Sequence, residues 1–144
     1  RFLLLLLVLN EWSLLFLHQN VTFMKSLLLI FLGGGTGSVF RYLLTINICR
    51  YETTNFPWGT FAVNILGCIF IGVFYTLTSR IHINNDIRLM LTIGLCGGFT
   101  TFSTFGNESF QLLKSGLYSS FFAYVISSVV FGILGVMLGV WMSE

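Results

Sequence analysis

Runs of residues without Asp, Glu, Lys or Arg divide most of this chain. Three such runs cover residues 53–79, 89–107 and 115–143, and a fourth, residues 26–48, is interrupted only by Arg41. Each run is close to or above the roughly 20 residues that a helix needs to cross the hydrocarbon core of a bilayer. Short polar segments separate the runs. The pattern therefore predicts an all-α integral membrane protein, with four transmembrane helices joined by short loops in an up-down bundle.

Composition supports this fold class and excludes others. The 144 residues are 56% hydrophobic and only 8% charged, whereas soluble domains carry about 25% charged residues. A multi-pass protein of the cell membrane is predicted, with no room for a separate soluble catalytic domain. The net charge of +2 is too small to argue for a nucleic-acid partner. The three cysteines lack metal-ligand spacing and no nucleophile–base set is present, so the sequence does not predict an enzyme.

The first 23 residues do not fit the pattern of complete spans. The apolar run at residues 1–9 is too short to cross a bilayer, and Asn10 and Glu11 follow it. One interpretation is an interfacial or fifth helix, and another is a signal-like segment, although no small-residue cleavage site is evident. We favour a third, because Met24 stands directly before the first complete span. Residues 1–23 are then an extension of no clear role, and residues 24–144 form the working domain.

Glycines mark the segments where helices are expected to loosen or to approach closely. Residues 94–105, GLCGGFTTFSTF, combine three glycines with four hydroxyl side chains and three phenylalanines in an apolar span. A loosened backbone persists in lipid only where protein or a water-filled cavity covers it, so this segment predicts a pathway through the membrane. The pairs Gly33 with Gly37 and Gly135 with Gly139 have the spacing of close helix packing.

The basic residues give no preferred orientation in the membrane. With four spans, the start of the first span and the second loop share one side, and the first and third loops share the other. One side then holds Lys25, Arg80 and Arg88, and the other holds Arg50, Lys114 and Arg41 if its side chain reaches that surface. Because an excess of Lys and Arg normally marks the cytoplasmic side, this balance fits two interpretations. The protein has a weak orientation signal, or it inserts both ways and opposite copies pair as an antiparallel dimer.

Three segments carry a resemblance to a known family. They are GGGTGSVFRYL at residues 33–43, FPWGTFAVNILG at 56–67 and GLCGGFTTFSTF at 94–105. In this order and on these spans they resemble the signature segments of the CrcB/Fluc fluoride channels, and the resemblance covers residues 24–144. It implies passive export of fluoride, which lowers cytoplasmic fluoride. It also implies an antiparallel dual-topology homodimer in the lipid bilayer, with two fluoride pores, a broken third helix and a central structural Na+ ion.

The resemblance also assigns the centre of the pore. Asn64 offers an amide donor in the middle of the second span. From the residue alone we favour an interhelical hydrogen bond, but its place in the second signature segment implies contact with fluoride. Phe102 and Phe105 share one helix face, and the positive edge of an aromatic ring can face an anion. A pair among 16 phenylalanines is usually packing, so their pore role comes from the resemblance.

Further residues are assigned by similarity to the polar track of the family. They are Ser103 and Thr104 on the third span, Tyr124 and Ser128 four residues apart on the last span, and Glu108 one turn beyond Phe105. Hydroxyls in membrane helices commonly bond to their own backbone, so each is weak evidence by itself. Glu108 is an ordinary interfacial carboxylate or, as the resemblance implies, a hydrogen-bonding or proton-linked gate residue.

Two more assignments concern charge: Arg41 toward anions, and Gly97 with Thr100 toward Na+. Arg41 is the one cation within a span, and it is expected either to extend to the surface as an anchor or to give a pore vestibule a positive potential. Gly97 and Thr100 match the family positions whose backbone carbonyls hold Na+. The alternative at these two positions is a glycine kink with water.

Two rival functions differ in testable ways from a fluoride channel. A proton-coupled exporter of the small multidrug type would typically carry a carboxylate in its first span, and residues 26–48 contain none. A non-conducting membrane subunit would not require Asn64 together with the Phe102 and Phe105 pair. Within the family a paired heterodimer is also known, but this chain keeps the pore residues, so the sequence favours a homodimer.

Overall fold

The computed structural model describes the backbone of residues 2–50, 54–81 and 83–144, and side chains at residue 17 and from residue 19 onward within these ranges. Every regular element in the described part is helical. The elements are α1 (Phe2–Cys49), α2 (Trp58–Arg80), α3 (Asn85–Leu89), the π-helix η1 (Met90–Cys96), α4 (Gly97–Phe99), α5 (Phe102–Lys114) and α6 (Tyr118–Met142).

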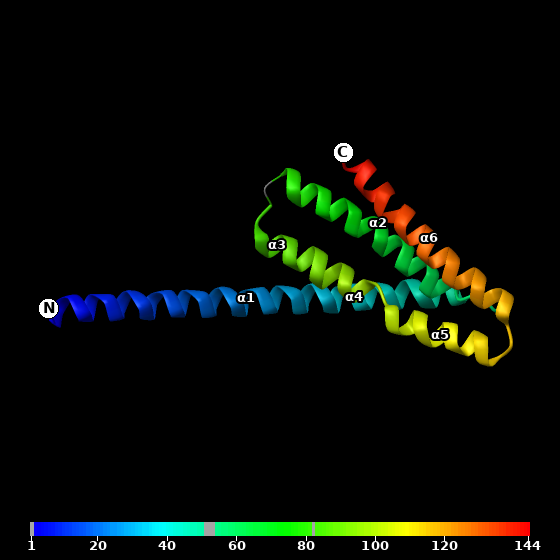
Figure 1. Ribbon diagram of the computed structural model, residues 1–144, viewed down its shortest axis with the longest axis horizontal. Coiled ribbons are helices and arrows are strands. Elements are labelled where there is room, and N and C mark those ends of the chain that lie inside the picture. Colours follow the sequence, from blue (N-terminus) through cyan, green and yellow to red (C-terminus); the bar gives the residue numbers. More distant parts are fainter. Residues whose placement is uncertain (1, 51–53, 82) are drawn as a thin grey trace.

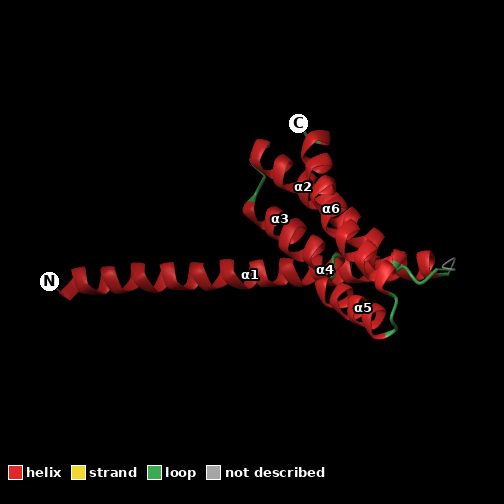
Figure 2. Ribbon diagram, turned by 45° about the vertical axis from the view of Figure 1, so that its right-hand side comes forward, coloured by secondary structure: helices red, strands yellow, loops and turns green. Residues whose placement is uncertain are grey.

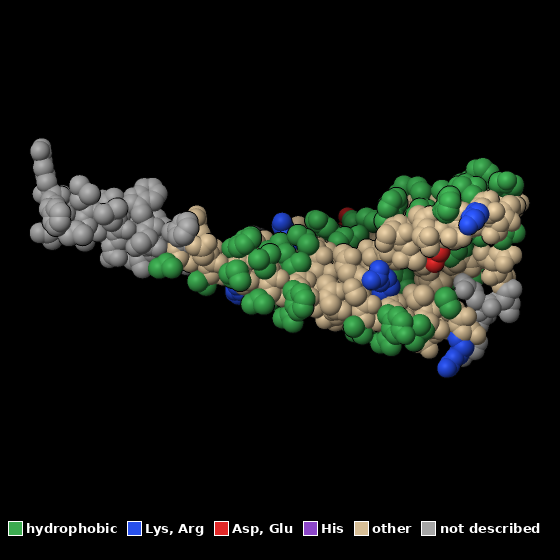
Figure 3. Space-filling view, turned by 90° about the horizontal axis from the view of Figure 1, so that it is seen from below, with side chains coloured by type: hydrophobic (Ala, Val, Ile, Leu, Met, Phe, Trp, Pro, Cys, Tyr) green, Lys and Arg blue, Asp and Glu red, His purple; other side chains and the backbone are tan. Residues whose placement is uncertain are grey.

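Four stretches are long and apolar enough to cross a membrane. They are Gln19–Cys49, Trp58–Arg80, Asn85–Lys114 and Tyr118–Met142, and the third comprises α3, η1, α4 and α5. The four predicted spans are therefore confirmed, although the expected start of the second run, at residue 53, lies outside the described residues. Hydrophobic side chains spread over the described face in Figure 3, where Lys and Arg are few.

The four spans form a bundle from which one helix projects. Helices α2 and α6 run side by side, and the C-terminal part of α1 packs against η1 and α4 (Figures 1 and 2). The N-terminal end of α1 extends well beyond the other helices. Because α1 is continuous from Phe2 to Cys49, the backbone has no interruption at Met24. The division into an extension and a working domain stays a prediction.

Glycines allow both principal helix contacts. A Cβ on Gly94 of η1 would lie 3.0 Å from the Cα of Gly33 on α1, and one on Gly72 of α2 would lie 3.2 Å from the Cα of Gly139 on α6. Contacts this short leave no space for a larger residue, so the helix backbones themselves are in contact. The close packing predicted for the glycine pairs of the first and last spans is confirmed.

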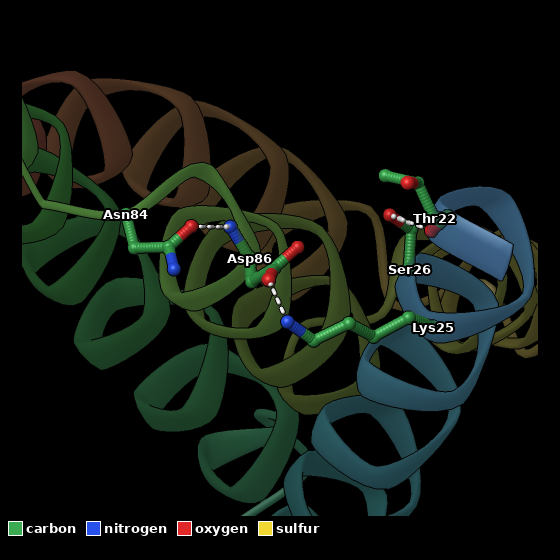
Figure 4. A network of polar contacts seen from close by, with 5 residues as sticks. All are labelled: Thr22, Lys25, Ser26, Asn84 and Asp86. Atoms are coloured by element: carbon green, nitrogen blue, oxygen red, sulfur yellow. Dashed lines mark hydrogen bonds and ion pairs between the residues drawn. The ribbon is translucent and has the colours of Figure 1, made fainter. Parts of the chain in front are cut away.

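Polar contacts join the ends of the four spans in two pairs on one side of the bundle. Lys25 Nζ lies 2.5 Å from Asp86 Oδ2, and the side chain of Asn84 caps α3 by accepting a hydrogen bond from the Asp86 N–H at 3.1 Å (Figure 4). At the same side Arg80 donates to the backbone carbonyl of Glu144. The start of the first span, the second loop and the C-terminus therefore lie together, as the up-down arrangement requires.

Candidate functional site

The helical backbone of the third span is interrupted between α4 and α5. Thr100 has φ −79° and ψ 158°, and Thr101 has φ −148° and ψ 114°, so both residues are extended. In a continuous helix the Thr101 N–H would donate to the carbonyl of Gly97, but here it donates to Asn64 Oδ1 at 2.8 Å. The Thr104 N–H donates to the Thr101 hydroxyl at 3.3 Å in place of the Thr100 carbonyl. The carbonyls of Gly97 and Thr100 thus lose their usual helical donors.

Asn64 on α2 joins the second span to this interruption. Its Oδ1 accepts from the Thr101 N–H, and its Nδ2 donates to the Thr101 carbonyl at 3.2 Å. The Asn64 side chain therefore pairs with both backbone polar groups of Thr101. This is the interhelical hydrogen bonding that the residue by itself predicted. A carboxamide nitrogen carries two N–H groups. Asn64 also lines a cavity beside the interruption.

A cavity of about 450 Å³ lies beside the interruption, between α2, η1, α5 and α6. Of the predicted site residues, it is lined by Asn64, Gly97, Thr100, Phe102, Phe105 and Ser128. The Phe102 and Phe105 ring centroids are 5.7 Å apart, and Phe102 is 84% exposed in the single chain. In the described part of the chain, the buried Ser128 hydroxyl has no hydrogen-bond partner. The cavity thus combines aromatic rings with a hydroxyl that has no partner among the described residues, and both kinds of group can face a small anion.

Glu108 is held by two buried hydroxyl groups from other spans. Thr60 on α2 donates to Glu108 Oε1 at 2.8 Å, and Tyr124 on α6 donates to Glu108 Oε2 at 2.7 Å. Thr60 is 4% exposed and Tyr124 is fully buried. The Tyr124 ring also lies 5.0 Å from the ring of Phe105, which lines the cavity. The carboxylate and the cavity are therefore connected through a single tyrosine.

Comparison with known proteins identifies the family. Residues 28–140 match the family described as "CrcB-like protein, Camphor Resistance (CrcB)". The chain belongs to the CrcB family. Three of its relatives bear the name "Fluoride-specific ion channel FluC". The relative from Phocaeicola vulgatus is 88% identical over 121 residues, which are 84% of this chain and all of the relative. The relatives from Bacteroides fragilis and Leptospira interrogans are each 48% identical, over 124 and 123 residues, which are 84% and 85% of this chain and 98% and 97% of the relatives.

These findings confirm the resemblance that the three signature segments carry. Together with the four apolar spans, they make this CrcB protein a multi-pass membrane protein. The relatives are named as channels, which agrees with the prediction that the chain is not an enzyme. The comparisons do not assign roles to individual residues, so the pore and Na+ assignments stay predictions.

Five of the residues assigned by family similarity do not line the cavity of the single chain. Two of them, Glu108 and Tyr124, are joined to it through the contact of Tyr124 with Phe105. Arg41 is half-buried on α1, and Ser103 and Thr104 are exposed on the first turn of α5. Both hydroxyls are close to the Thr101 hydroxyl, with Oγ–Oγ distances of 3.3 Å and 3.0 Å. In this CrcB chain Ser103 and Thr104 therefore belong to the cap of α5. Arg41 is on α1, which contributes no residue to the cavity lining.

Sequence reasoning missed two residues of the site. Thr60 binds the carboxylate of Glu108, and Thr101 provides both the cap of α5 and the peptide groups that Asn64 binds. A signal was present for each. Thr60 is four residues before Asn64 and so shares its helix face, and a Thr after a glycine-rich stretch is a favourable helix N-cap.

Proposed function

We propose that this CrcB-family protein is a fluoride-specific ion channel, through which fluoride leaves the cytoplasm passively across the cell membrane. The observation that carries the proposal is the relative named "Fluoride-specific ion channel FluC", which is 88% identical over its whole length. The chemistry of the cavity agrees. Fluoride must exchange water for hydrogen-bond donors and ring edges that do not hold it too tightly, and the amide, hydroxyl and phenyl groups of the cavity are of that kind.

The proposed path runs from Glu108 to the phenylalanine pair. The Tyr124 hydroxyl is bound to Glu108, and its ring contacts Phe105, which with Phe102 provides ring edges to the ion. Glu108 acts as a hydrogen-bonding gate residue in this proposal, because the Tyr124 hydroxyl that donates to its carboxylate can exchange that bond for one to the passing ion. Arg41 adds positive potential to a vestibule without binding the ion.

The assembly we propose is an antiparallel dual-topology homodimer with a broken third helix in each subunit. Three observations support it. The cavity is open on one side, where Phe102 is 84% exposed, so a second copy would cover it. Extended backbone at Thr100 and Thr101 within an otherwise helical span supports the break. The balanced Lys and Arg distribution supports insertion in both orientations.

We further propose that the carbonyls of Gly97 and Thr100, from both subunits, hold a structural Na+ ion. The residues fit such a site, because both carbonyls have lost their helical donors and both residues line the cavity. A Cβ on Gly97 would meet no atom within 4 Å, which leaves space for an approaching partner. Bound Na+ would supply the positive charge that satisfies these carbonyls. Thermal unfolding of the dimer tests this: Tm should be higher in Na+ than in N-methylglucamine at equal ionic strength.

The test of function is fluoride efflux from liposomes that hold the purified full chain. We expect rapid fluoride release without chloride release, and no dependence on a proton gradient. A dependence on the proton gradient would favour the exporter. No release from a folded dimer would favour a non-conducting subunit or a missing second chain. A second sample that starts at Met24 tests whether residues 1–23 have a role.

A matched pair of substitutions on α5 tests the pore assignment. Phe102→Ile removes a ring from the cavity. We expect efflux to fall about tenfold or more, because the ion loses a positive ring edge that would replace part of its hydration water. Phe110→Ile removes a second exposed ring of α5, 60% exposed, that does not line the cavity. Equal efflux from the two variants would contradict the assignment.

A further inference from the structure

A smaller cavity is lined by Glu108 itself. Its volume is about 230 Å³, and its polar lining consists of Asn55, Glu108, Gln111 and Ser115. The last three are on one face of the C-terminal half of α5 and the turn that follows, and Asn55 comes from the segment before α2. Of the described residues, no Lys or Arg lines this cavity.

The position of Glu108 makes the two cavities consecutive. Glu108 lines the smaller cavity, and both oxygens of its carboxylate are bound by the more deeply buried Thr60 and Tyr124. Tyr124 then contacts Phe105, a residue of the larger cavity. An ion that approaches Glu108 from the side of the first and third loops, through the smaller cavity, would pass the groups that line it.

We propose that the side-chain amide of Gln111, assisted by that of Asn55, is a selectivity-determining donor at the mouth of this path. The inference rests on the proposed function. A carboxamide offers two N–H donors and no net charge, so it replaces part of the water around fluoride without holding the ion. Such donors are needed here because the carboxylate of Glu108, one turn away, repels an anion. The Thr60 and Tyr124 hydroxyls point the positive ends of their O–H dipoles at the carboxylate and so offset part of that repulsion.

Two substitutions of Gln111 separate the loss of its donors from a change of charge. Gln111→Glu keeps the shape, removes the donors and adds a negative charge, while Gln111→Met removes the donors alone. We expect fluoride efflux from liposomes to fall about tenfold or more for Gln111→Glu and about threefold or more for Gln111→Met, as expected for a lost hydrogen bond to an ion. Gln111 is exposed, so both variants should fold, and gel filtration checks this.

The control is Lys114→Gln, which changes the net charge by the same amount as Gln111→Glu. Lys114 is exposed at the end of α5, one turn from Gln111, and does not line the cavity. We expect its efflux to stay within about twofold of the unaltered protein, because exposed charges are strongly screened. Equal losses for Lys114→Gln and Gln111→Glu, with none for Gln111→Met, would show a general charge effect and overturn the inference.

The same measurements separate this inference from the function on which it rests. Unaltered protein that releases fluoride, together with both Gln111 variants within about twofold of it, would overturn the role of Gln111 alone. Unaltered protein that is folded but releases no fluoride would overturn the proposed function and the inference with it.

Discussion

The two hydrogen bonds between Asn64 and Thr101 make a prediction about stability that can be worked out from the structure. Asn64→Ala removes both bonds, at 2.8 Å and 3.2 Å, and leaves the N–H and the carbonyl of Thr101 without these partners inside a membrane span. Side-chain hydrogen bonds in helical membrane proteins are worth about 0.6 kcal/mol on average and up to about 1.7 kcal/mol. The two bonds together therefore contribute about 1–3 kcal/mol to the free energy of unfolding.

We expect Asn64→Ala to lower the unfolding free energy by about 2 kcal/mol, near the middle of this range, because the N–H and the carbonyl of Thr101 both lose their side-chain partner within a span. That corresponds to a Tm lower by about 4–8 °C. The assay is thermal unfolding of the purified protein in detergent, followed by intrinsic tryptophan fluorescence. Fluoride efflux is measured on the same samples below the Tm of the variant.

A matched control is available on α1. Asn47 donates from Nδ2 to the carbonyl of Leu43 four residues earlier, where the backbone is already helical. Asn47→Ala should therefore change the unfolding free energy by less than about 0.5 kcal/mol, since Ala is also the better helix former. Equal stability of the Asn64 and Asn47 variants would refute the argument that Asn64 holds the interruption. Loss of efflux with unchanged stability would leave Asn64 a role in the pore only.

Three further predictions concern the remaining contacts. Tyr124→Phe keeps the ring but removes the donor to Glu108, so we expect about 2 kcal/mol lower stability and reduced efflux; unchanged values in both assays would contradict the network. In Gly98→Ala the new Cβ would lie 2.8 Å from the Cα of Gly34 on α1, and this overlap should lower the unfolding free energy by about 3 kcal/mol. Gly106→Ala, with no atom within 4 Å, should be neutral or stabilising in the same unfolding assay. Asp86→Asn breaks an ion pair whose Lys is 60% exposed, so a stability loss above about 1 kcal/mol would be unexpected.

The transmembrane organisation could be predicted from the sequence because it depends on local properties. Length and absence of charge placed all four spans, and glycine spacing identified the close contacts of the first and last spans. The π-helix Met90–Cys96 was not predicted. In a π-helix each hydrogen bond spans five residues and not four, and the pattern of apolar residues does not distinguish the two; η1 packs closely against α1.

The site was only partly predictable for a similar reason. The sequence identified Asn64, Phe102, Phe105 and Ser128, which line one cavity. It did not reveal that the amide of Asn64 would bind the backbone of Thr101, because that bond joins residues 37 positions apart. Hydrogen-bond partners of this kind are set by the arrangement of helices, and a single sequence contains no record of which distant donor reaches which acceptor.

The paired bonds of Asn64 also restrict how the protein can move. Because one side chain binds both the N–H and the carbonyl of Thr101, α2 and the start of α5 cannot slide or rotate past each other unless two hydrogen bonds break together. A transporter that alternates between inward and outward openings rocks one part of its bundle against another in every cycle. Rocking of α2 against α5 would break both Asn64 hydrogen bonds in every cycle, so these bonds favour a pathway whose helices keep their positions while the ion moves.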